Sequence, residues 1–198
     1  PELLLELFSE EIPARMQARA AADLKRLVTE RLSDAGLACT RAEAFVTPRR
    51  LALVVAGLPA RQPDTGEEKR GPRTDAPDKA VEGFLRANNV TLEECERRVA
   101  GKGEFWFAVI ERKGRSTADV LCDLLPDAIR KLPWQKSMRW GEGTLRWVRP
   151  LLRILCVLDA KTVPLNIGDG VPCGNVTSGH RFLSPEPFEV GFFDDYEK

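Results

Sequence analysis

The stretch ELLLELF at residues 2–8, followed by SEEIP at residues 9–13, decides how the fold begins. Its apolar run predicts a short buried strand, and the serine and two glutamates after it suit the capped, acidic start of a helix. Apolar residues then recur at helical spacing up to about Ala35, and Gly36 is a typical helix stop. The sequence therefore predicts a buried strand that leads directly into a long amphipathic helix.

Further along the chain, hydrophobic patterning and turn residues predict more strands and helices. The expected strands cover residues 44–58, 103–113, 151–158 and 162–167. Residues 59–78, rich in proline, glycine and charge, are expected to form a loop or mobile insertion, and a short helix follows at 78–88. Capping boxes begin at Thr91 and at Ser116, and the second one starts a helix that reaches Leu132.

This order of strand, helix, strand, helical insertion, strand, helix, strand predicts an α+β fold with an antiparallel sheet and packed helices. A split βαβ arrangement, as in ferredoxin-like folds, fits it. We expect residues 1–158 to form one α+β domain, in which residues 59–100 are a loop and helical insertion. Residues 159–198 are expected to begin a second, incomplete β-rich domain.

Composition limits the class of protein. Of 198 residues, 43% are hydrophobic and 30% are charged, which is enough apolar material for a core. The five cysteines are widely spaced and favour reduced thiols, and one histidine cannot supply the ligands of a zinc site. With neither an export signal nor an apolar run long enough to span a membrane, the chain is expected to be cytoplasmic, without a membrane partner.

Catalytic signatures are missing from the sequence. It contains no phosphate-binding glycine loop, no HExxH and no GxSxG, and His180 has no identified nucleophile beside it. Glu10 and Glu11 would point about 100° apart on a helix, so a role in the first helical turn suits them better than acid–base catalysis. We therefore predict no catalytic residue and no bound cofactor or metal in this chain.

Three clusters of basic residues are more informative about function than the search for catalytic motifs. They are Thr47-Pro48-Arg49-Arg50, the stretch from Lys136-Ser137-Met138-Arg139-Trp140-Gly141 to Arg146-Trp147-Val148-Arg149-Pro150, and Gly179-His180-Arg181-Phe182. Arginine forks bind phosphates, and aromatic rings offer stacking faces to unpaired bases. The alternative is structural: the tryptophans would be core residues, and Arg139 and Arg149 would pair with acids such as Glu142.

Read in order, several segments resemble the bacterial glycyl-tRNA synthetase beta subunit. They are Leu4-Leu5-Glu6-Leu7-Phe8-Ser9-Glu10-Glu11-Ile12-Pro13, Thr47-Pro48-Arg49-Arg50-Leu51-Ala52-Leu53, Lys69-Arg70-Gly71-Pro72, Lys136-Ser137-Met138-Arg139-Trp140-Gly141, Val148-Arg149-Pro150 and Gly179-His180-Arg181-Phe182. Each segment is weak alone, but together and in order they cover nearly the whole chain. The resemblance implies that this chain is the N-terminal part of a much larger subunit.

The resemblance also implies a glycine–tRNA ligase that charges tRNA(Gly) with glycine at the expense of ATP. In that family the alpha subunit holds the aminoacylation site, with ATP and magnesium, and the beta subunit handles the tRNA within a heterotetramer. The implied role of this chain is tRNA handling and subunit assembly. The residues expected to touch tRNA or a partner are Arg49, Arg50, Lys136, Arg139, Trp140, Arg149, His180 and Arg181. Two rivals are a docking module for the alpha subunit without tRNA contact and a stand-alone enzyme that uses His180.

The distribution of charge decides whether a polyanion is a credible partner. The formal net charge is zero, which excludes a uniformly basic binder. Residues 1–12 and 186–198 each carry a net charge of −4, whereas residues 131–181 carry eight bases and three acids. Because local fields steer a polyanion, this segregation leaves room for a local patch that faces RNA or a partner.

Overall fold

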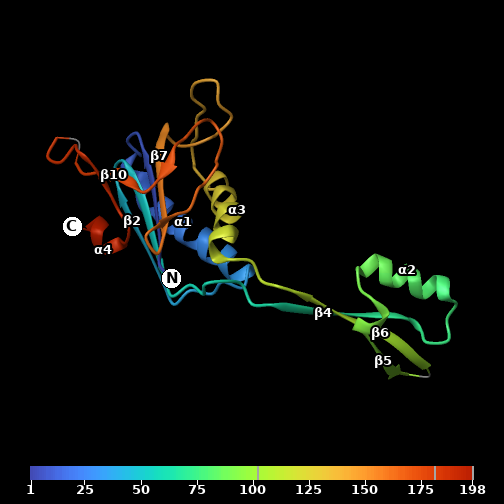
Figure 1. Ribbon diagram of the computed structural model, residues 1–198. Helices are drawn as coiled ribbons and strands as arrows, with labels where there is room; N and C mark the ends of the chain where they lie inside the picture. Colours follow the sequence, from blue (N-terminus) through green and yellow to red (C-terminus); the bar gives the residue numbers. More distant parts are fainter. Residues whose placement is uncertain (102, 181, 198) are drawn as a thin grey trace. The chain divides into compact units, whose positions relative to one another are not determined.

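A computed structural model describes residues 1–101, 103–180 and 182–197 of the chain (Figure 1). It divides into two compact units. Unit 1 contains Pro1–Gln62 and Arg115–Lys198, and unit 2 contains Pro63–Gly114. Each unit has its own sheet, and each is described by itself below.

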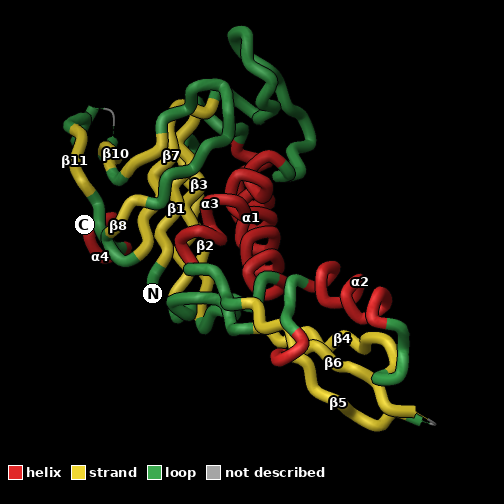
Figure 2. Tube along the Cα trace, turned by 45° about the vertical axis from the view of Figure 1, so that its right-hand side comes forward, coloured by secondary structure: helices red, strands yellow, loops and turns green. Residues whose placement is uncertain are grey.

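The sheet of unit 1 is built around its first strand, β1 (Leu3–Ser9), which pairs on both sides with antiparallel neighbours (Figure 2). The strand order is β2-β3-β1-β7-β8, and β9 pairs with β7 in parallel. The other strands are β2 (Arg41–Thr47), β3 (Arg50–Ala56), β7 (Leu151–Leu158), β8 (Lys161–Thr162) and β9 (Cys173–Gly174). The ELLLELF stretch thus forms the centre of the sheet, which explains why it is apolar on both faces.

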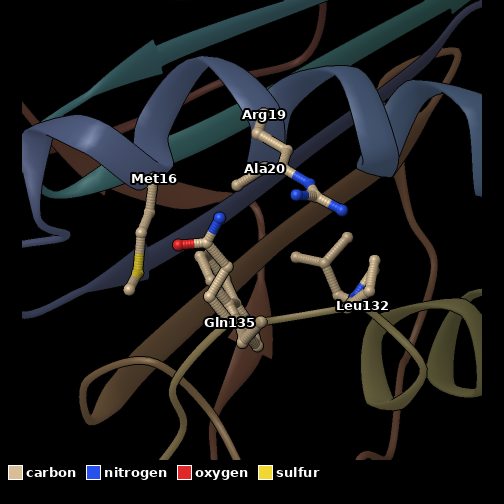
Figure 3. A pocket seen from close by; sticks show the side chains of 7 residues that line it. Met16, Arg19, Ala20, Leu132 and Gln135 are labelled. Carbon is tan, nitrogen blue, oxygen red and sulfur yellow. The ribbon is translucent and has the colours of Figure 1, made fainter.

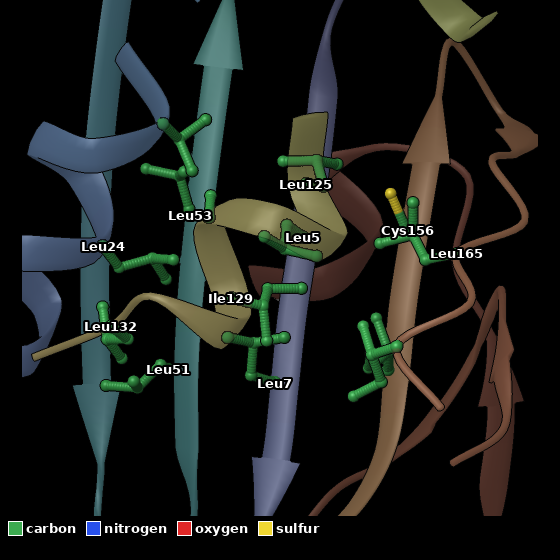
Figure 4. Close-up of a cluster of buried hydrophobic side chains, with 14 of the residues drawn as sticks. Leu5, Leu7, Leu24, Leu51, Leu53, Leu125, Ile129, Leu132, Cys156 and Leu165 are labelled. Atoms are coloured by element: carbon green, nitrogen blue, oxygen red, sulfur yellow. The ribbon is translucent and has the colours of Figure 1, made fainter. Parts of the chain in front are cut away.

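Two helices cover one face of this sheet, α1 (Ala14–Asp34) and α3 (Thr117–Arg130). Leucines from β1, β3 and both helices pack together there, as Figure 4 shows. The α1 residues that are buried recur every three or four positions, as an amphipathic helix requires. At the start of α3, the Ser116 side chain accepts a hydrogen bond from the Asp119 N–H, which confirms the predicted cap.

The opposite face of the sheet is covered by the end of the chain. Leu4 of β1 and Leu155 and Val157 of β7 pack there with Val190. Around them lie β10 (Val176–Ser178), β11 (Pro187–Glu189) and α4 (Phe193–Glu197), whose residues Phe193 and Tyr196 pack on this cluster. This second layer is where Glu6, the charged residue of β1, points, because side chains alternate along a strand.

Unit 2 is a small antiparallel sheet with a helix. Its strands run in the order β4-β6-β5, with β4 at Thr65–Arg73, β5 at Cys95–Ala100 and β6 at Gly103–Arg112. The helix α2 (Asp78–Asn88) and a 3-10 turn (Leu92–Glu94) connect β4 to β5, and the predicted capping box is present at Thr91. Among the described residues of the unit, only Trp106 and Ala108 are buried.

The α+β class with antiparallel sheets is confirmed, and three of the expected strands need correction. Residues 44–58 are not one strand, since β2 and β3 form a hairpin that turns at Pro48 and Arg49. The strand expected at 103–113 exists, but it pairs with β4 and β5 in unit 2. The strand expected at 162–167 is short and covers only Lys161–Thr162.

Two further expectations about the architecture stay predictions. They are the likeness to ferredoxin-like folds and a second domain that begins at residue 159. In the structure, residues 159–197 lie in the same compact unit as β1 and β7.

Candidate functional site

A cavity of about 500 Å³ opens where the end of β1, the turn between β2 and β3, and the loop after β10 meet. It is lined by Phe8, Glu11, Thr47, Pro48, Arg49, Arg50, Ser178, Gly179, His180, Phe182 and Pro185. The first and third basic clusters, about 130 residues apart in the chain, therefore share one cavity. Of the third cluster, Arg181 lies outside the described residues.

Behind this cavity, the fully buried carboxylate of Glu6 organises a network of polar side chains. It accepts hydrogen bonds from the Thr177 hydroxyl at 2.7 Å and the Tyr196 hydroxyl at 2.6 Å. Its Oε2 atom lies 3.0 Å from Nε of Arg50. Burial, and then the charge of Glu6, raise the pKa of Tyr196 far above its usual range, so this hydroxyl stays protonated and donates. A buried charge with three partners is a typical satisfied arrangement.

Arg50 is anchored inside the protein through Nε, which faces Glu6, and through Nη2. Besides the ion pair with Glu6, its Nη2 donates to the carbonyl oxygens of Ser178 and Gly179, the latter at 3.0 Å. These bonds tie β3 to the loop that carries His180. That Arg50 contacts a phosphate or a partner stays a prediction, and in the structure its guanidinium bonds to one wall of the cavity that it lines.

Arg49 is held more loosely than Arg50. Its Nε donates to the Ser9 carbonyl at 3.2 Å, and its Nη2 lies 3.4 Å from a carboxylate oxygen of Glu10. The side chain keeps 24% of its surface exposed. This leaves Arg49 better placed than Arg50 to contact a ligand in the cavity.

Three arginines surround the ring of Phe8. The guanidinium carbons of Arg49 and Arg50 lie 4.9 Å from the ring centre, and that of Arg153 lies 4.3 Å away. Arg153 also donates to the Ser178 hydroxyl at 2.7 Å, and burial is the main reason its pKa is lowered. Three carboxylates lie near these arginines: Glu6 is buried and pairs with Arg50, Glu10 pairs with Arg49 at the surface, and Glu11 lines the cavity.

The rim of the cavity carries two rings on the segment after β10. His180 is exposed, and its ring centre lies 6.0 Å from that of Phe182. The Phe182 N–H donates to His180 Nδ1 at 3.3 Å, and 74% of Phe182 is exposed. An aromatic pair at the edge of a basic cavity suits stacking against an unpaired base.

The second basic cluster lies in the loop between α3 and β7, and the structure separates its tryptophans from its cations. Trp147 is buried and packs edge-on against Trp134, with ring centres 4.9 Å apart. Trp140, expected to stack or to touch a partner, is half-buried and packs against the core. For the tryptophans, the structural alternative therefore fits better.

The cations of that loop point outward. Lys136, Arg139 and Arg149 are exposed, and no described carboxylate lies within 4.0 Å of them, Glu142 included. Among the described residues, Arg149 donates to the neighbouring Val148 carbonyl alone, at 2.9 Å. None of these three residues is among the described lining of the 500 Å³ cavity, so the loop is a separate surface. It is anchored by Asp169, which accepts hydrogen bonds from the N–H groups of Thr144 and Leu145.

Unit 1 also has a much smaller hollow, beside the loop of the second basic cluster. A hollow between α1 and the start of this loop, lined by Met16, Arg19, Ala20, Leu132, Pro133, Trp134 and Gln135, holds about 10 Å³, roughly the space of one water (Figure 3). The described residues include no group of three or more His, Cys, Asp or Glu side chains placed to hold a metal ion. None of the described helices is long and apolar enough to cross a membrane.

Sequence reasoning missed Glu6, Phe8 and Arg153 as parts of this site. The available signal was Glu6 itself, because a lone carboxylate inside an apolar strand needs buried partners. Its partners come from β3, β10 and α4, so the pattern along the chain did not reveal them.

Comparison with known proteins matches residues 3–198 to the family described as glycyl-tRNA synthetase beta subunit. The glycine–tRNA ligase beta subunit of Paracoccus denitrificans is 56% identical over 200 residues, which cover 99% of this chain. That of Dinoroseobacter shibae is 54% identical over 201 residues, and that of Rhodospirillum centenum is 51% identical over 220 residues.

These matches put the chain in one class of ligase, the aminoacyl-tRNA synthetases. Within that class it belongs to the glycyl-tRNA synthetase beta subunit family. The chain spans less than a third of the length of the curated relatives it matches, between 28% and 31% in these three. It corresponds to their N-terminal part.

Proposed function

We propose that this chain is a tRNA-handling region of a two-subunit glycine–tRNA ligase and that the 500 Å³ cavity contacts the tRNA. The observation that carries the proposal is the convergence of Arg49, Arg50 and His180 on that cavity. Positive charge and exposed rings together match the phosphate and the base of an unpaired nucleotide. The family name of the relatives supports the choice of tRNA as the nucleic acid.

We assign a role to each residue from the contacts that it makes. Arg49 binds a phosphate, because its guanidinium is partly exposed at the cavity wall. Arg50 positions the loop that carries His180, because its nitrogens are engaged inside the protein. His180 and Phe182 offer stacking faces at the rim. Lys136, Arg139 and Arg149 form a second surface for phosphates, on which the exposed cations have no described acidic partner.

The chemistry of aminoacylation belongs to the rest of the enzyme in this proposal. ATP, magnesium and glycine bind to the alpha subunit, and alpha and beta subunits assemble as a cytoplasmic heterotetramer. The region described here supplies no catalytic group, and its contribution is to hold the tRNA and to help the subunits assemble.

One observation favours a second candidate, docking of the alpha subunit on the same surface without tRNA contact. Phe182 and its neighbour Leu183 are 74% and 86% exposed, and large exposed apolar side chains are typical of protein interfaces. The two candidates differ in what happens when the cations are removed.

The test is binding of tRNA(Gly) to the two-subunit enzyme at several salt concentrations. Arg49→Ala should weaken binding several-fold and reduce the dependence of log K on log salt by about 0.7 to 0.9, the value for one lost phosphate contact. Arg41→Ala is the matched control, because Arg41 is an exposed arginine of the adjacent strand outside the cavity, paired with Glu43. It should leave both quantities unchanged.

Three other results would contradict the proposal or part of it. If Arg49→Ala and Arg41→Ala behave alike, the cavity does not bind tRNA. If Arg49→Ala leaves tRNA affinity intact but the alpha subunit no longer copurifies, the docking function replaces it. The pair Arg139→Ala with Arg149→Ala tests the second surface in the same way, and an unchanged salt dependence excludes it.

A further inference from the structure

Unit 2 contains a second hollow lined by arginines, at the end of the hairpin formed by β5 and β6. It has a volume of about 410 Å³. The described residues that line it are Arg70, Arg73, Ala100, Gly101, Gly103 and Phe105, and none of them is acidic. All six belong to unit 2, so this hollow is distinct from the cavity in unit 1.

Arg70 is held by stacking. Its guanidinium carbon lies 3.7 Å from the ring centre of Phe105, so the flat face of the guanidinium covers the ring. Stacking leaves the N–H groups at the edge of the guanidinium available, and these are the groups that bind phosphate oxygens. Among the described side chains, no carboxylate lies within 4.0 Å of Arg70, which is exposed.

Arg98 on β5 is an arginine of the same unit whose guanidinium edge is occupied. Its guanidinium carbon lies 5.7 Å from the ring centre of Phe107 on β6, farther than Arg70 lies from Phe105. Its Nη1 contacts Glu68 at 2.5 Å, and its Nη2 contacts Glu96 at 2.6 Å. Arg98 therefore has two anionic partners already, whereas Arg70 has an aromatic support and an open edge.

A second guanidinium lies at the same hollow because the hairpin carries little side-chain bulk. A Cβ atom added at Gly103 would lie 3.1 Å from Nε and 3.3 Å from Cζ of Arg73, so a larger residue would push Arg73 away. Gly101 has a φ of +70°, a backbone conformation that L residues rarely adopt. Arg73 has one acidic contact, 3.2 Å to the exposed Asp75.

We propose that this hollow binds single-stranded nucleic acid, with Arg70 and Arg73 donating to one phosphate and a base stacking on the open face of the Arg70 guanidinium. The two guanidiniums supply donors for phosphate oxygens, and a guanidinium plane supported by a ring is a good stacking surface for a base. The function proposed above concerns the cavity of unit 1, and this inference adds a separate contact in unit 2.

The experiment measures binding of a fluorescently labelled ten-nucleotide oligouridine to the whole chain by anisotropy at several salt concentrations. Arg70→Ala should weaken binding about five-fold or more and lower the salt dependence of log K by about 0.7. Arg70→Lys should keep the salt dependence and still lose affinity, because lysine retains the charge without the stacking plane. Arg98→Ala, the matched control, should stay within two-fold of the wild type.

Equal effects of Arg70→Ala and Arg98→Ala, or none at all from Arg70→Ala, would overturn the proposal. So would displacement of the oligonucleotide by millimolar inorganic phosphate alone, which would show a site for a free anion. If Arg70→Ala leaves oligonucleotide binding unchanged but the full-length subunit carrying it no longer copurifies with the alpha subunit, the hollow is a protein contact instead.

Two controls keep the test decisive. If circular dichroism shows that Arg70→Ala does not fold, Arg73→Ala tests the same hollow and should also weaken binding. Each variant is also measured in an Arg49→Ala background. An Arg70 effect that persists there, while Arg49→Ala alone has none, would remove the function proposed for unit 1 and leave this inference standing.

Discussion

Two arginines, Arg50 in unit 1 and Arg70 in unit 2, differ in which part of the guanidinium is engaged. In unit 1, Arg50 contacts Glu6 and two backbone carbonyl oxygens through its nitrogens, so the edge of its guanidinium is engaged. In unit 2, Arg70 rests on Phe105 through its face, and its edge is open. An arginine that is fixed through its edge organises the protein around it, whereas one that is supported through its face can still bind an anion.

The same contrast extends to the two cores. Unit 1 buries the leucines of β1 and β3 beneath α1 and α3, and a polar network on the other face of β1 ties in α4. The described part of unit 2 buries only Trp106 and Ala108. We therefore expect substitutions to have very different costs in the two units, and three predictions sharpen that comparison.

The largest effect is expected from Glu6→Ala in unit 1. It would leave Arg50 and Arg153 without their buried counter-charge, and breaking a buried ion pair costs about 3–5 kcal/mol. The counterpart in unit 2, Glu68→Ala, breaks an exposed pair with Arg98 and should lower the unfolding free energy far less, because solvent screens surface ion pairs. Urea unfolding of both variants, followed by circular dichroism, measures the difference. Equal losses of unfolding free energy would mean that the Glu6 network contributes no more than a surface pair.

A comparable but more local effect is expected from Trp106→Ala. Removing this ring from the thin core of unit 2 should cost about 3 kcal/mol, and it also removes the surface on which Arg97 lies at 4.7 Å. Amides of β4, β5 and β6 should lose their protection in hydrogen exchange. Leu24→Ala is the counterpart in α1, and it should lower the protection of β1, β3 and β7. Full protection of β6 in the Trp106→Ala variant would contradict the view that this unit depends on one side chain.

The smallest effect concerns pH and the loop that carries the second basic cluster. Backbone hydrogen bonds from Thr144 and Leu145 lower the pKa of Asp169 below its usual range. A carboxylate with a lowered pKa stabilises the folded state at neutral pH, and this contribution is lost as the pH falls below about 4. Asp169→Asn should therefore lower the melting temperature at pH 7, and the difference from the wild type should shrink on acidification. Asparagine suits the test because it tolerates the positive φ of this position. A difference that stays constant down to pH 3 would exclude the carboxylate as its cause.

Sequence patterns predicted which segments of unit 1 form strands and helices better than they predicted which strands pair with each other. The strand β1, the body of the helix α1 and the cap of α3 follow from local signals in neighbouring residues. The cap and acidic first turn expected from Ser9, Glu10 and Glu11 are wrong, because α1 begins at Ala14 after Pro13 and its first turn holds no acidic residue. The hairpin of β2 and β3 was missed because its turn at Pro48 and Arg49 lacks the Asn-Gly or Asp-Gly signature of a tight hairpin. The strand at Gly103–Arg112 was recognised by its alternation, but alternation does not say which sheet a strand joins.

Sequence patterns likewise did not reveal which distant residues come together at the two candidate sites. Arg49, Arg50 and His180 were singled out as charged and aromatic residues, but their convergence depends on the bonds from Arg50 to the loop at Ser178, 128 residues away. Trp140 was read as a stacking surface, although it packs on the core. Arg70 entered only through a resemblance, because its support, Phe105, is distant in sequence and is brought close by the pairing of β4 with β6.

The bond between Glu6 and Tyr196 also bears on how the protein is made. The central strand β1 is synthesised before its partners, since one neighbour, β7, begins at Leu151, and the hydroxyl that satisfies Glu6 comes from Tyr196. Contacts between residues so far apart in sequence slow folding. Until synthesis has reached Tyr196, an apolar strand with a charge at its centre lacks its final partners. A chaperone that binds short apolar segments would find a target in β1 of the nascent chain.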